Sequence, residues 1–301
     1  MEWTHLMTNL KAKLEETRHL IDNFFDKTLE IPTGKEQRVV QAMRYSTIGG
    51  GKALRPFLIL SVAGILNVDP KQALNVAGAL EMVHTYSLIH DDLPAMDNDT
   101  MRRGKATNHV YFDEATAILA GDALLTKAFE VLSNPATHPD GMVRCRLISH
   151  LAKAAGTKGM IGGQMLDLIG EKTPLTLEEI ERMQIMKTGA LLKYACTAPA
   201  IMSGENGEKL KALETYAVAI GLMFQMTDDI LDIEGDSLVV GKTLGKDKTA
   251  KKSTFVSVLG IQETKENIKV LAQKAHNTLN IFEKDADILK QTIDFILTRN
   301  K

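Results

Sequence analysis

Residues 88–104 (LIHDDLPAMDNDTMRRG) place several aspartates directly after an apolar run. Asp91, Asp92 and Asp97 form the pattern D-D-x-x-x-x-D, and carboxylate oxygens in such a pattern suit hard divalent cations, above all Mg²⁺. Pro94 cannot continue the preceding helix without losing a backbone hydrogen bond, so the chain must bend there. We expect this bend to bring Asp97 back towards Asp91, where the helix ends.

The aspartates predict a phosphate-bearing ligand as well as a metal ion. Mg²⁺ is seldom caged by protein alone, and it completes its shell with water and phosphate oxygens. Arg102 and Arg103 follow at once, and guanidinium groups suit bidentate contact with phosphate. Taken alone, one such cluster of charges is about as often a solvated surface loop. The pair His90–Asp91 also resembles the ligands of metal-dependent phosphohydrolases, which remains an alternative at this point.

A second acidic segment, residues 224–236 (FQMTDDILDIEGD), carries the pattern D-D-x-x-D within an apolar helix. Asp228 and Asp232 are four residues apart and share one face, where like charges repel by ~0.2–0.5 kcal/mol in an exposed helix. Burial increases this penalty unless a cation lies between the two carboxylates. Two such motifs, each on an apolar helix, are much less expected by chance than one. Together they favour a metal-bound phosphate over a surface loop.

Basic residues occur in two further segments. Residues 241–254 (GKTLGKDKTAKKST) are rich in lysine, which alone indicates a solvated loop but beside an aspartate–Mg²⁺ site supplies counter-charge to a diphosphate. Residues 49–56 (GGGKALRP) combine a glycine turn with Lys52 and Arg55, ahead of a helix that starts near Pro56. Their spacing is not that of a Walker A loop, so nucleotide binding is not indicated.

Long buried helices are needed to position these side chains, and helical periodicity dominates the chain. Residues 74–90, 115–132 and 213–233 are apolar on more than one face, which is typical of helices buried in a bundle. Alternating strand patterns are hard to find. Thr176, followed by Glu179, predicts a helix start with a capping box. We therefore expect an all-α fold with ten or more helices around very apolar central ones.

The bulk composition is that of a globular protein. The chain has 301 residues, of which 44 % are hydrophobic and 25 % charged, with a net charge of -2 and 5 % aromatic residues. Neither a basic surface nor base-stacking aromatics point to nucleic acid. Two cysteines without metal-like spacing suit a reducing compartment, and neither a signal peptide nor an apolar run of membrane-spanning length is found. We expect residues 1–301 to form one cytoplasmic domain with no nucleic-acid or membrane partner.

Four motifs occur in an order that resembles a known family. GGKALRP, HTYSLIHDDLPAMDNDTMRRG, the triplet Lys187-Thr188-Gly189 and FQMTDDILD look like those of a short-chain trans-isoprenyl diphosphate synthase. The gap between Asp92 and Asp97 is similar to that of the bacterial farnesyl diphosphate synthase type. The likeness runs from about residue 50 to the C-terminus. It implies a single all-α isoprenoid synthase-like bundle, in which two aspartate-rich motifs face each other across a central cavity.

The resemblance also implies a role for each motif residue. The aspartates implied to hold three Mg²⁺ ions on an allylic diphosphate are Asp91, Asp97 and Asp228, with Asp92 and Asp232 assisting. The basic residues implied to bind that same diphosphate are Arg102, Lys187, Lys242 and Lys252. The residues implied to hold isopentenyl diphosphate are Lys52, Arg55, His84 and Arg103.

The same resemblance implies three further features. Thr188 and Gln225 would line the site where the allylic cation forms, and the basic tail 299–301 would close over isopentenyl diphosphate. The family often has a basic residue after the lysine of GGK, where Ala53 stands here, and this removes at most an auxiliary charge. His90 fits a packed helix histidine better than a ligand. A homodimer is usual for the family.

The implied reaction is the Mg²⁺-dependent head-to-tail condensation of isopentenyl diphosphate with dimethylallyl or geranyl diphosphate. Mg²⁺ neutralises the leaving diphosphate, an apolar interior keeps the allylic cation from water, and no side-chain nucleophile is required. Tyr86 lies five residues before Asp91, about 7.5 Å along the helix, where a ring would limit chain growth. On periodicity alone, a core aromatic without that duty is the better interpretation. The resemblance implies farnesyl diphosphate (C15) as product.

Three rival functions remain open from the sequence. A terpene cyclase of the same helical class usually carries an N-x-x-x-S/T-x-x-x-E second motif, whereas this chain has Asp228, Asp229 and Asp232. A metal-dependent phosphohydrolase would release phosphate without forming a carbon–carbon bond. A helical scaffold or inactive partner subunit would have no reason to retain both sets of acids.

Overall fold

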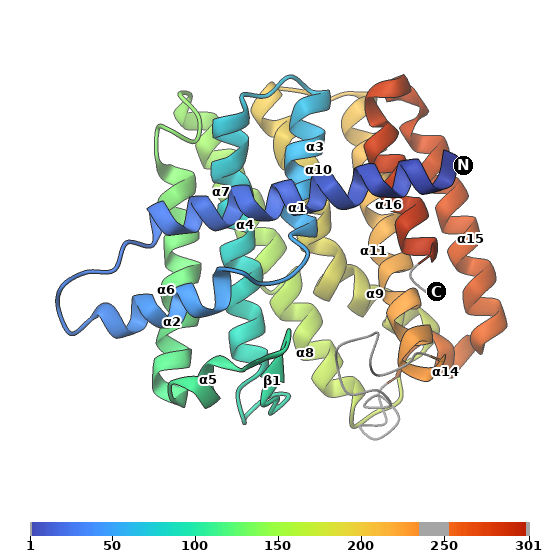
Figure 1. Ribbon diagram of the computed structural model, residues 1–301. Coiled ribbons are helices and arrows are strands. Elements are labelled where there is room, and N and C mark those ends of the chain that lie inside the picture. Colours follow the sequence, from blue (N-terminus) through green and yellow to red (C-terminus); the bar gives the residue numbers. More distant parts are fainter. Residues whose placement is uncertain (1, 235–252, 299–301) are drawn as a thin grey trace. The chain divides into compact units, whose positions relative to one another are not determined.

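The structure is a computed structural model that describes residues 2–234 and 253–298, and it is almost entirely helical (Figure 1). The described residues include more than ten helices and a single hairpin of two strands, β1 (Met101–Arg102) and β2 (Lys105–Ala106). The all-α expectation is therefore confirmed. None of the described helices is both long enough and apolar enough to cross a membrane.

The packing divides the chain into two compact units. One unit comprises Lys11–Ile148, and the other comprises Met1–Leu10 together with Ser149–Lys301. The two units are referred to below as the first and the second unit in that order, and each is described by itself. The expectation of one domain over residues 1–301 stays a prediction.

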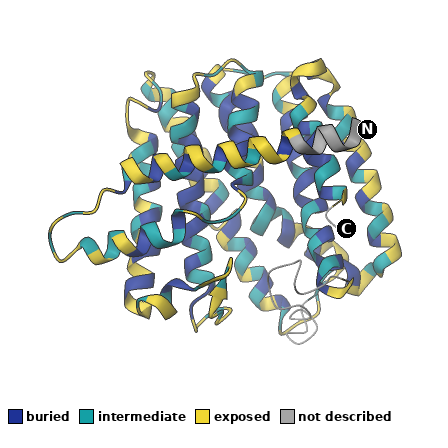
Figure 2. Cartoon of the chain, viewed as in Figure 1, coloured by how far each residue is buried: buried dark blue, intermediate teal, exposed yellow. Residues whose placement is uncertain are grey.

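The first unit is built around one central helix. Its helices are α1 (Glu2–Thr28, from Lys11 on), α2 (Gln37–Thr47), α3 (Leu54–Ile65), α4 (Pro70–Asp91), α5 (Asn108–Tyr111), α6 (Glu114–Ser133) and the start of α7 (Gly141–Ala155). Helix α4 packs against α3 and α6, and most of its residues are buried, as the dark blue colouring shows (Figure 2). Asp69 caps its N-terminus and Pro70 is its first residue, a favourable start for a helix.

The second unit has its own central helix. After the rest of α7 come α8 (Met160–Gly170), α9 (Leu177–Gln184), the π-helical segment η1 (Ile185–Gly189), α10 (Ala190–Ser203), α11 (Glu208–Glu234), α14 (Phe255–Leu259), α15 (Ile261–Thr278), the 3₁₀ segment η2 (Leu279–Ala286) and α16 (Asp287–Thr298). Helix α11 packs against α10, α15 and α16 and is largely buried. Thr176 and Glu179 form the predicted capping box at the start of α9.

Candidate active site

The first aspartate motif begins where α4 ends. Helix α4 stops at Asp91, and the backbone N–H of Asp97 donates a hydrogen bond of 2.9 Å to the carbonyl of Asp91. The N–H of Asn98 likewise returns to the carbonyl of Leu93 at 3.1 Å. The chain therefore folds back on itself after Pro94, as expected from the proline, and the backbones of Asp91 and Asp97 meet at one turn.

The middle aspartate of this motif is turned towards protein. Asp92 is only 3 % exposed, and its carboxylate accepts hydrogen bonds from Arg102 Nε at 2.7 Å and 3.0 Å, with Arg102 Nη2 at 2.7 Å. Burial raises the pKa of Asp92 although the guanidinium opposes this. Burial also acts to lower the pKa of Arg102, but its contacts with Asp92 leave that pKa raised. In this geometry Asp92 orients Arg102.

Arg103 lies at the tip of the hairpin β1–β2. Arg102 pairs with Lys105 across the two strands, so Arg103 and Gly104 form the connecting turn. Their φ angles are 52° and 76°, as in the type I′ turns that suit two-residue hairpins. Glycine adopts this conformation readily, whereas a left-handed arginine is uncommon and is retained where the surrounding structure over-determines it. The hairpin thus holds the side chain of Arg103 next to Gly50 and Gly51.

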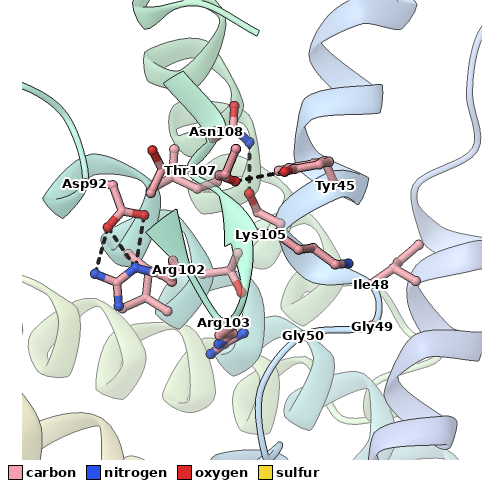
Figure 3. Close-up of a pocket in the computed structure, with 15 residues that line it drawn as sticks. Tyr45, Ile48, Gly49, Gly50, Asp92, Arg102, Arg103, Lys105, Thr107 and Asn108 are labelled. Atoms are coloured by element: carbon pink, nitrogen blue, oxygen red, sulfur yellow. Dashed lines mark hydrogen bonds and ion pairs between the residues drawn. The ribbon is translucent and has the colours of Figure 1, made fainter. Parts of the chain in front are cut away.

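These glycines belong to the turn between α2 and α3. The φ angle is positive at every second residue, namely Gly49, Gly51 and Ala53. Backbone of alternating hand gathers consecutive N–H groups into an anion-binding nest. A Cβ atom added at Gly51 would lie 2.6 Å from the guanidinium carbon of Arg103, so only glycine permits this arginine over the turn. Figure 3 shows Arg103 directed at this backbone.

A buried charge cluster adjoins Arg103. Arg55 Nη1 lies 3.2 Å from His84 Nε2, and because a guanidinium only donates, the imidazole accepts there and is neutral. Burial, followed by the charges of Arg55 and Arg103, lowers the pKa of His84 well below its ordinary value. Glu81, one turn earlier on α4, is also buried, and burial raises its pKa against the pull of the two arginines. Glu81 is not among the residues predicted from the sequence, where its only signal is an acid within an apolar helix.

A cavity of about 50 Å³ lies beside the hairpin (Figure 3). Its walls include Gly49, Gly50, Arg103 and two side chains with buried oxygens, Thr85 and Asn108. Within the described residues, Thr85 Oγ1 and Asn108 Oδ1 have no hydrogen-bond partner. A bound water suits these two oxygens, because it can donate to the amide oxygen of Asn108 and exchange a hydrogen bond with the hydroxyl of Thr85.

The second aspartate motif lies within the unbroken helix α11. Asp228 and Asp232 are one turn apart, as expected. Asp229, 3 % exposed, accepts 2.9 Å hydrogen bonds from Gln225 Nε2 and from the backbone N–H of Phe255, the first residue of α14. Asp229 therefore joins α11 to α14, and the amide of Gln225 is directed at this carboxylate.

Lys187 and Thr188 lie in the π-helical segment η1. The ammonium of Lys187 donates a hydrogen bond of 2.6 Å to Oδ2 of Asp167, a buried residue of α8. Asp167 is not among the residues predicted from the sequence, although it is the single acid in the apolar segment 160–170. Its partner lies 20 positions further along the chain, which no local pattern reveals.

Comparison with known proteins agrees with this arrangement. Residues 36–294 match the family model of polyprenyl synthetases. The chain belongs to the polyprenyl synthetase family. It is 44 % identical over 292 residues to the farnesyl diphosphate synthase of Micrococcus luteus, covering 97 % of this chain and 100 % of that protein. A geranylgeranyl diphosphate synthase of Cyanophora paradoxa is 40 % identical, with 97 % of each chain covered.

A solved structure gives the same result. The crystal structure of an apo FPP/GFPP synthase from Zymomonas mobilis superposes with a TM-score of 0.89 and 42 % identity, over 97 % of this chain and 100 % of that one. Membership of the polyprenyl synthetases confirms the family that the motifs indicated. Members of the family use divalent metal ions to bind diphosphate.

The donor groups of this polyprenyl synthetase fit such an ion. Among the residues that the structure describes, no three His, Cys, Asp or Glu side chains are grouped so that they could hold a metal by themselves. Mg²⁺ typically takes one or two carboxylates and fills its shell with water and phosphate oxygens. Asp228 and Asp232 on α11, and Asp91 and Asp97 at the turn after α4, therefore suit an ion that binds together with a diphosphate.

Tyr86 is buried on α4. Its ring meets His90 edge-on at 5.7 Å, and its hydroxyl has no hydrogen-bond partner in the described part of the chain. Burial, aided by the charge of Asp91, raises the pKa of Tyr86 to about 12. His90 itself packs on α6, where its Nε2 lies 3.1 Å from the carbonyl of Ile118, as expected for a packed histidine.

Some predicted site residues cannot be placed. Lys242, Lys252 and the basic tail 299–301 lie outside the described residues. The two aspartate motifs belong to different units, so their convergence on one ligand stays a prediction.

Proposed function

We propose that this polyprenyl synthetase is a Mg²⁺-dependent prenyltransferase that condenses isopentenyl diphosphate with dimethylallyl or geranyl diphosphate. The proposal is supported by two chemically different groups of side chains and backbone in the first unit, each suited to a diphosphate in its own way. The motif around Asp91 offers carboxylates for a metal-bound diphosphate, whereas Arg103 and the nest at Gly51 offer only cations and N–H donors. Two diphosphates, one with metal and one without, are what a condensation requires. A cyclase or a hydrolase needs one.

The metal-bound diphosphate belongs to the allylic substrate. Asp91, Asp97 and Asp228, with Asp92 and Asp232 assisting, would hold three Mg²⁺ ions, which would supply positive charge to this diphosphate. Arg102, oriented by Asp92, and Lys187, held by Asp167, supply positive charge to the same group. Lys242 and Lys252 are proposed to add to it.

Isopentenyl diphosphate is proposed to bind the cationic group around Arg103. Lys52, Arg55 and Arg103 neutralise its charges, and guanidinium forks match phosphate oxygens. His84 stays neutral because it is buried against Arg55. It therefore contributes a ring N–H from Nδ1 rather than a further charge.

The chemistry then needs little from side chains beyond positioning. Bound Mg²⁺ stabilises the negative charge that builds on the departing diphosphate. The allylic carbon–oxygen bond breaks and its electron pair leaves with the diphosphate. The double bond of isopentenyl diphosphate attacks the allylic carbon, and a proton passes to the released diphosphate. Thr188 and Gln225 are proposed to face the cation, while apolar helix surfaces exclude water.

The proposed product is farnesyl diphosphate. The names of the relatives span more than one product length at similar identity, so they leave this choice to the chain itself. Tyr86 is proposed as the floor that stops growth at fifteen carbons, because it is a buried ring one and a half turns before Asp91. We further propose a cytoplasmic homodimer without nucleic-acid or membrane partners.

The deciding experiment supplies radiolabelled isopentenyl diphosphate with each allylic primer and Mg²⁺, and separates the dephosphorylated products by chromatography. The proposal expects labelled farnesol. Phosphate release without labelled carbon chains would indicate a phosphohydrolase. A hydrocarbon formed from the allylic diphosphate alone would indicate a terpene cyclase, and no turnover in any arm would indicate a scaffold.

A further inference from the structure

The segment that carries Lys187 departs from regular helix. Residues Ile185–Gly189 form the π-helical segment η1, with α9 running into it and α10 running out of it. A π-turn inserts an extra residue into a helix, shifts the register of the residues after it, and is found mostly at functional sites. Lys187 is the middle residue of this segment. Its backbone is therefore displaced from the path that α9 alone would give it.

Helix α8 is shaped to receive the displaced backbone. A Cβ atom at Gly163 would lie 2.2 Å from the backbone nitrogen of Lys187 and 2.6 Å from its Cα, distances that no real side chain tolerates. At Gly162 a Cβ atom would lie 2.7 Å from Cε of Met186. Two adjacent glycines thus allow η1 to approach α8 directly, and this contact fixes where the side chain of Lys187 starts.

Asp167 fixes where that side chain ends. It lies four residues after Gly163, hence on the same face of α8. Its Oδ2 accepts the 2.6 Å hydrogen bond from Lys187 Nζ, and the residue is 9 % exposed. A lysine side chain has about 2 kcal/mol of rotamer entropy, so an ammonium without a partner would sample many positions. Both ends of Lys187 are therefore held by α8.

A second lysine of the same unit shows what an ordinary pair looks like. Lys193 Nζ lies 2.9 Å from Glu214, but the two side chains are 47 % and 40 % exposed. Surface pairs of this kind contribute little. Lys187 and Asp167 have side-chain exposures of 27 % and 11 %. The Lys187–Asp167 pair is therefore more buried than this surface pair, and its geometry is more tightly constrained.

We propose that Asp167 is a positioning residue for the allylic diphosphate, acting through Lys187. This inference rests on the proposed function, in which Lys187 binds that diphosphate. The carboxylate holds the ammonium in one place before substrate arrives, so the entropy of ordering the lysine is not lost on binding. Removal of the carboxylate affects the allylic substrate, whereas isopentenyl diphosphate, held by groups of the first unit, is unaffected.

The test compares Asp167→Asn, Asp167→Glu and the matched surface control Glu214→Gln by steady-state kinetics, with each substrate varied in turn. Asp167→Asn is expected to lower kcat/KM for the allylic diphosphate about 10- to 100-fold and to leave KM for isopentenyl diphosphate unchanged. Asp167→Glu, which keeps the charge, recovers part of the loss. Glu214→Gln behaves as wild type. Equal losses for both substrates, or no loss, would overturn the proposal.

A double-mutant cycle guards against a folding defect. In a Lys187→Gln background, replacing Asp167 with Asn joins two neutral amides, and a positioning role predicts no further loss of kcat/KM. A further loss as large as in wild type would show that Asp167 acts independently of Lys187.

Calorimetric titration with inorganic diphosphate and Mg²⁺ separates this inference from the proposed function. Asp167→Asn should bind about tenfold more weakly than wild type, which is about 1.4 kcal/mol. If wild type fails to condense isopentenyl diphosphate, the proposed function falls, and this titration still tests Asp167. Unchanged binding in Asp167→Asn would refute the positioning role whatever the reaction is.

Discussion

The two aspartate motifs present their acids on different kinds of backbone. The first needs a break, because Asp91 ends α4 and Asp97 returns to it only through a hydrogen-bonded turn. The second needs none, because Asp228 and Asp232 follow each other on one turn of α11. A loop motif depends on whatever holds the loop, whereas a helix motif depends on the helix alone.

The second aspartate of each D-D pair, Asp92 or Asp229, differs from its counterpart in its hydrogen-bond partners. Asp92 and Asp229 are both 3 % exposed and both hydrogen-bonded to protein, but their partners differ in kind. Asp92 binds the cation Arg102, whereas Asp229 binds a side-chain amide and a backbone N–H. Each motif therefore contains one buried acid that is hydrogen-bonded to protein. In the first motif this acid, Asp92, orients the positive charge of Arg102.

The largest predicted effect comes from the acids assigned to metal. Asp97→Asn in the first motif and Asp228→Asn in the second should each lower kcat/KM about 1,000-fold, because each removes charge that stabilises the leaving diphosphate. The midpoint temperature of thermal unfolding should not fall in Asp97→Asn, since less like charge is left in the first motif. Glu130→Gln, at an exposed pair on α6, serves as control. A loss confined to one motif would mean that the two do not share a diphosphate.

The helices that lead to the motifs should differ in chain-length control. Tyr86 lies five residues before Asp91, and Met223 lies five before Asp228, and both are buried. Each change to alanine opens a cavity at a cost of about 3 kcal/mol in unfolding free energy. Only Tyr86→Ala should lengthen the product beyond fifteen carbons, as measured by chromatography. An unchanged product from Tyr86→Ala, or a longer one from Met223→Ala, would contradict the proposal that Tyr86 on α4 limits chain length.

Local chemistry explains how much of this could be read from the sequence. Pro94 forces a bend within three residues of Asp91, and Thr176 with Glu179 closes a capping box within one turn, so both were predictable. The pattern D-D-x-x-D on an apolar helix places its acids without help from elsewhere. Such features need only neighbouring residues, and all of them are found in the structure.

Contacts between distant segments could not be read in this way. One partner of Asp229 is a backbone N–H 26 residues later. Lys187 meets Asp167 only because a π-turn approaches two glycines of α8. The hairpin that carries Arg103 has two residues per strand, too few for an alternating pattern. Periodicity carries no information about such pairs, because they depend on how helices pack.

Replacing Asp92 should lower the free energy of unfolding more than replacing Asp229. Asp92→Asn removes the nearest counter-charge of Arg102 and leaves Asp99 at 3.8 Å, at a cost of about 2 kcal/mol, less than for a fully buried pair because Arg102 is 32 % exposed. Asp229→Asn loses hydrogen bonds from neutral donors, at about 1 kcal/mol. Urea unfolding measures both. Equal losses would contradict the distinction between a charged and a neutral anchor.

The smallest predicted effect concerns pH, and it belongs to α4 alone. Seven residues before Asp91 is His84, whereas the same position before Asp228 is Gly221, which does not titrate. Burial beside Arg55 and Arg103 lowers the pKa of His84 well below about 6.5, so the folded protein binds this proton less readily than the unfolded chain. Its contribution to stability is complete above about pH 6.5 and is lost as pH falls from there towards the folded-state pKa.

Replacement of His84 with Gln, which still accepts from Arg55, should remove that part of the pH dependence. Between about pH 7.5 and about pH 5.5, unfolding free energy should fall more in wild type than in His84→Gln. Glu81 acts in the opposite direction, because burial raises its pKa and the folded state gains that proton as pH falls, but it is common to both proteins. His19→Gln, at an exposed histidine of α1, should behave as wild type. Parallel curves for His84→Gln and wild type would show that this imidazole is not the buried neutral group that binds Arg55.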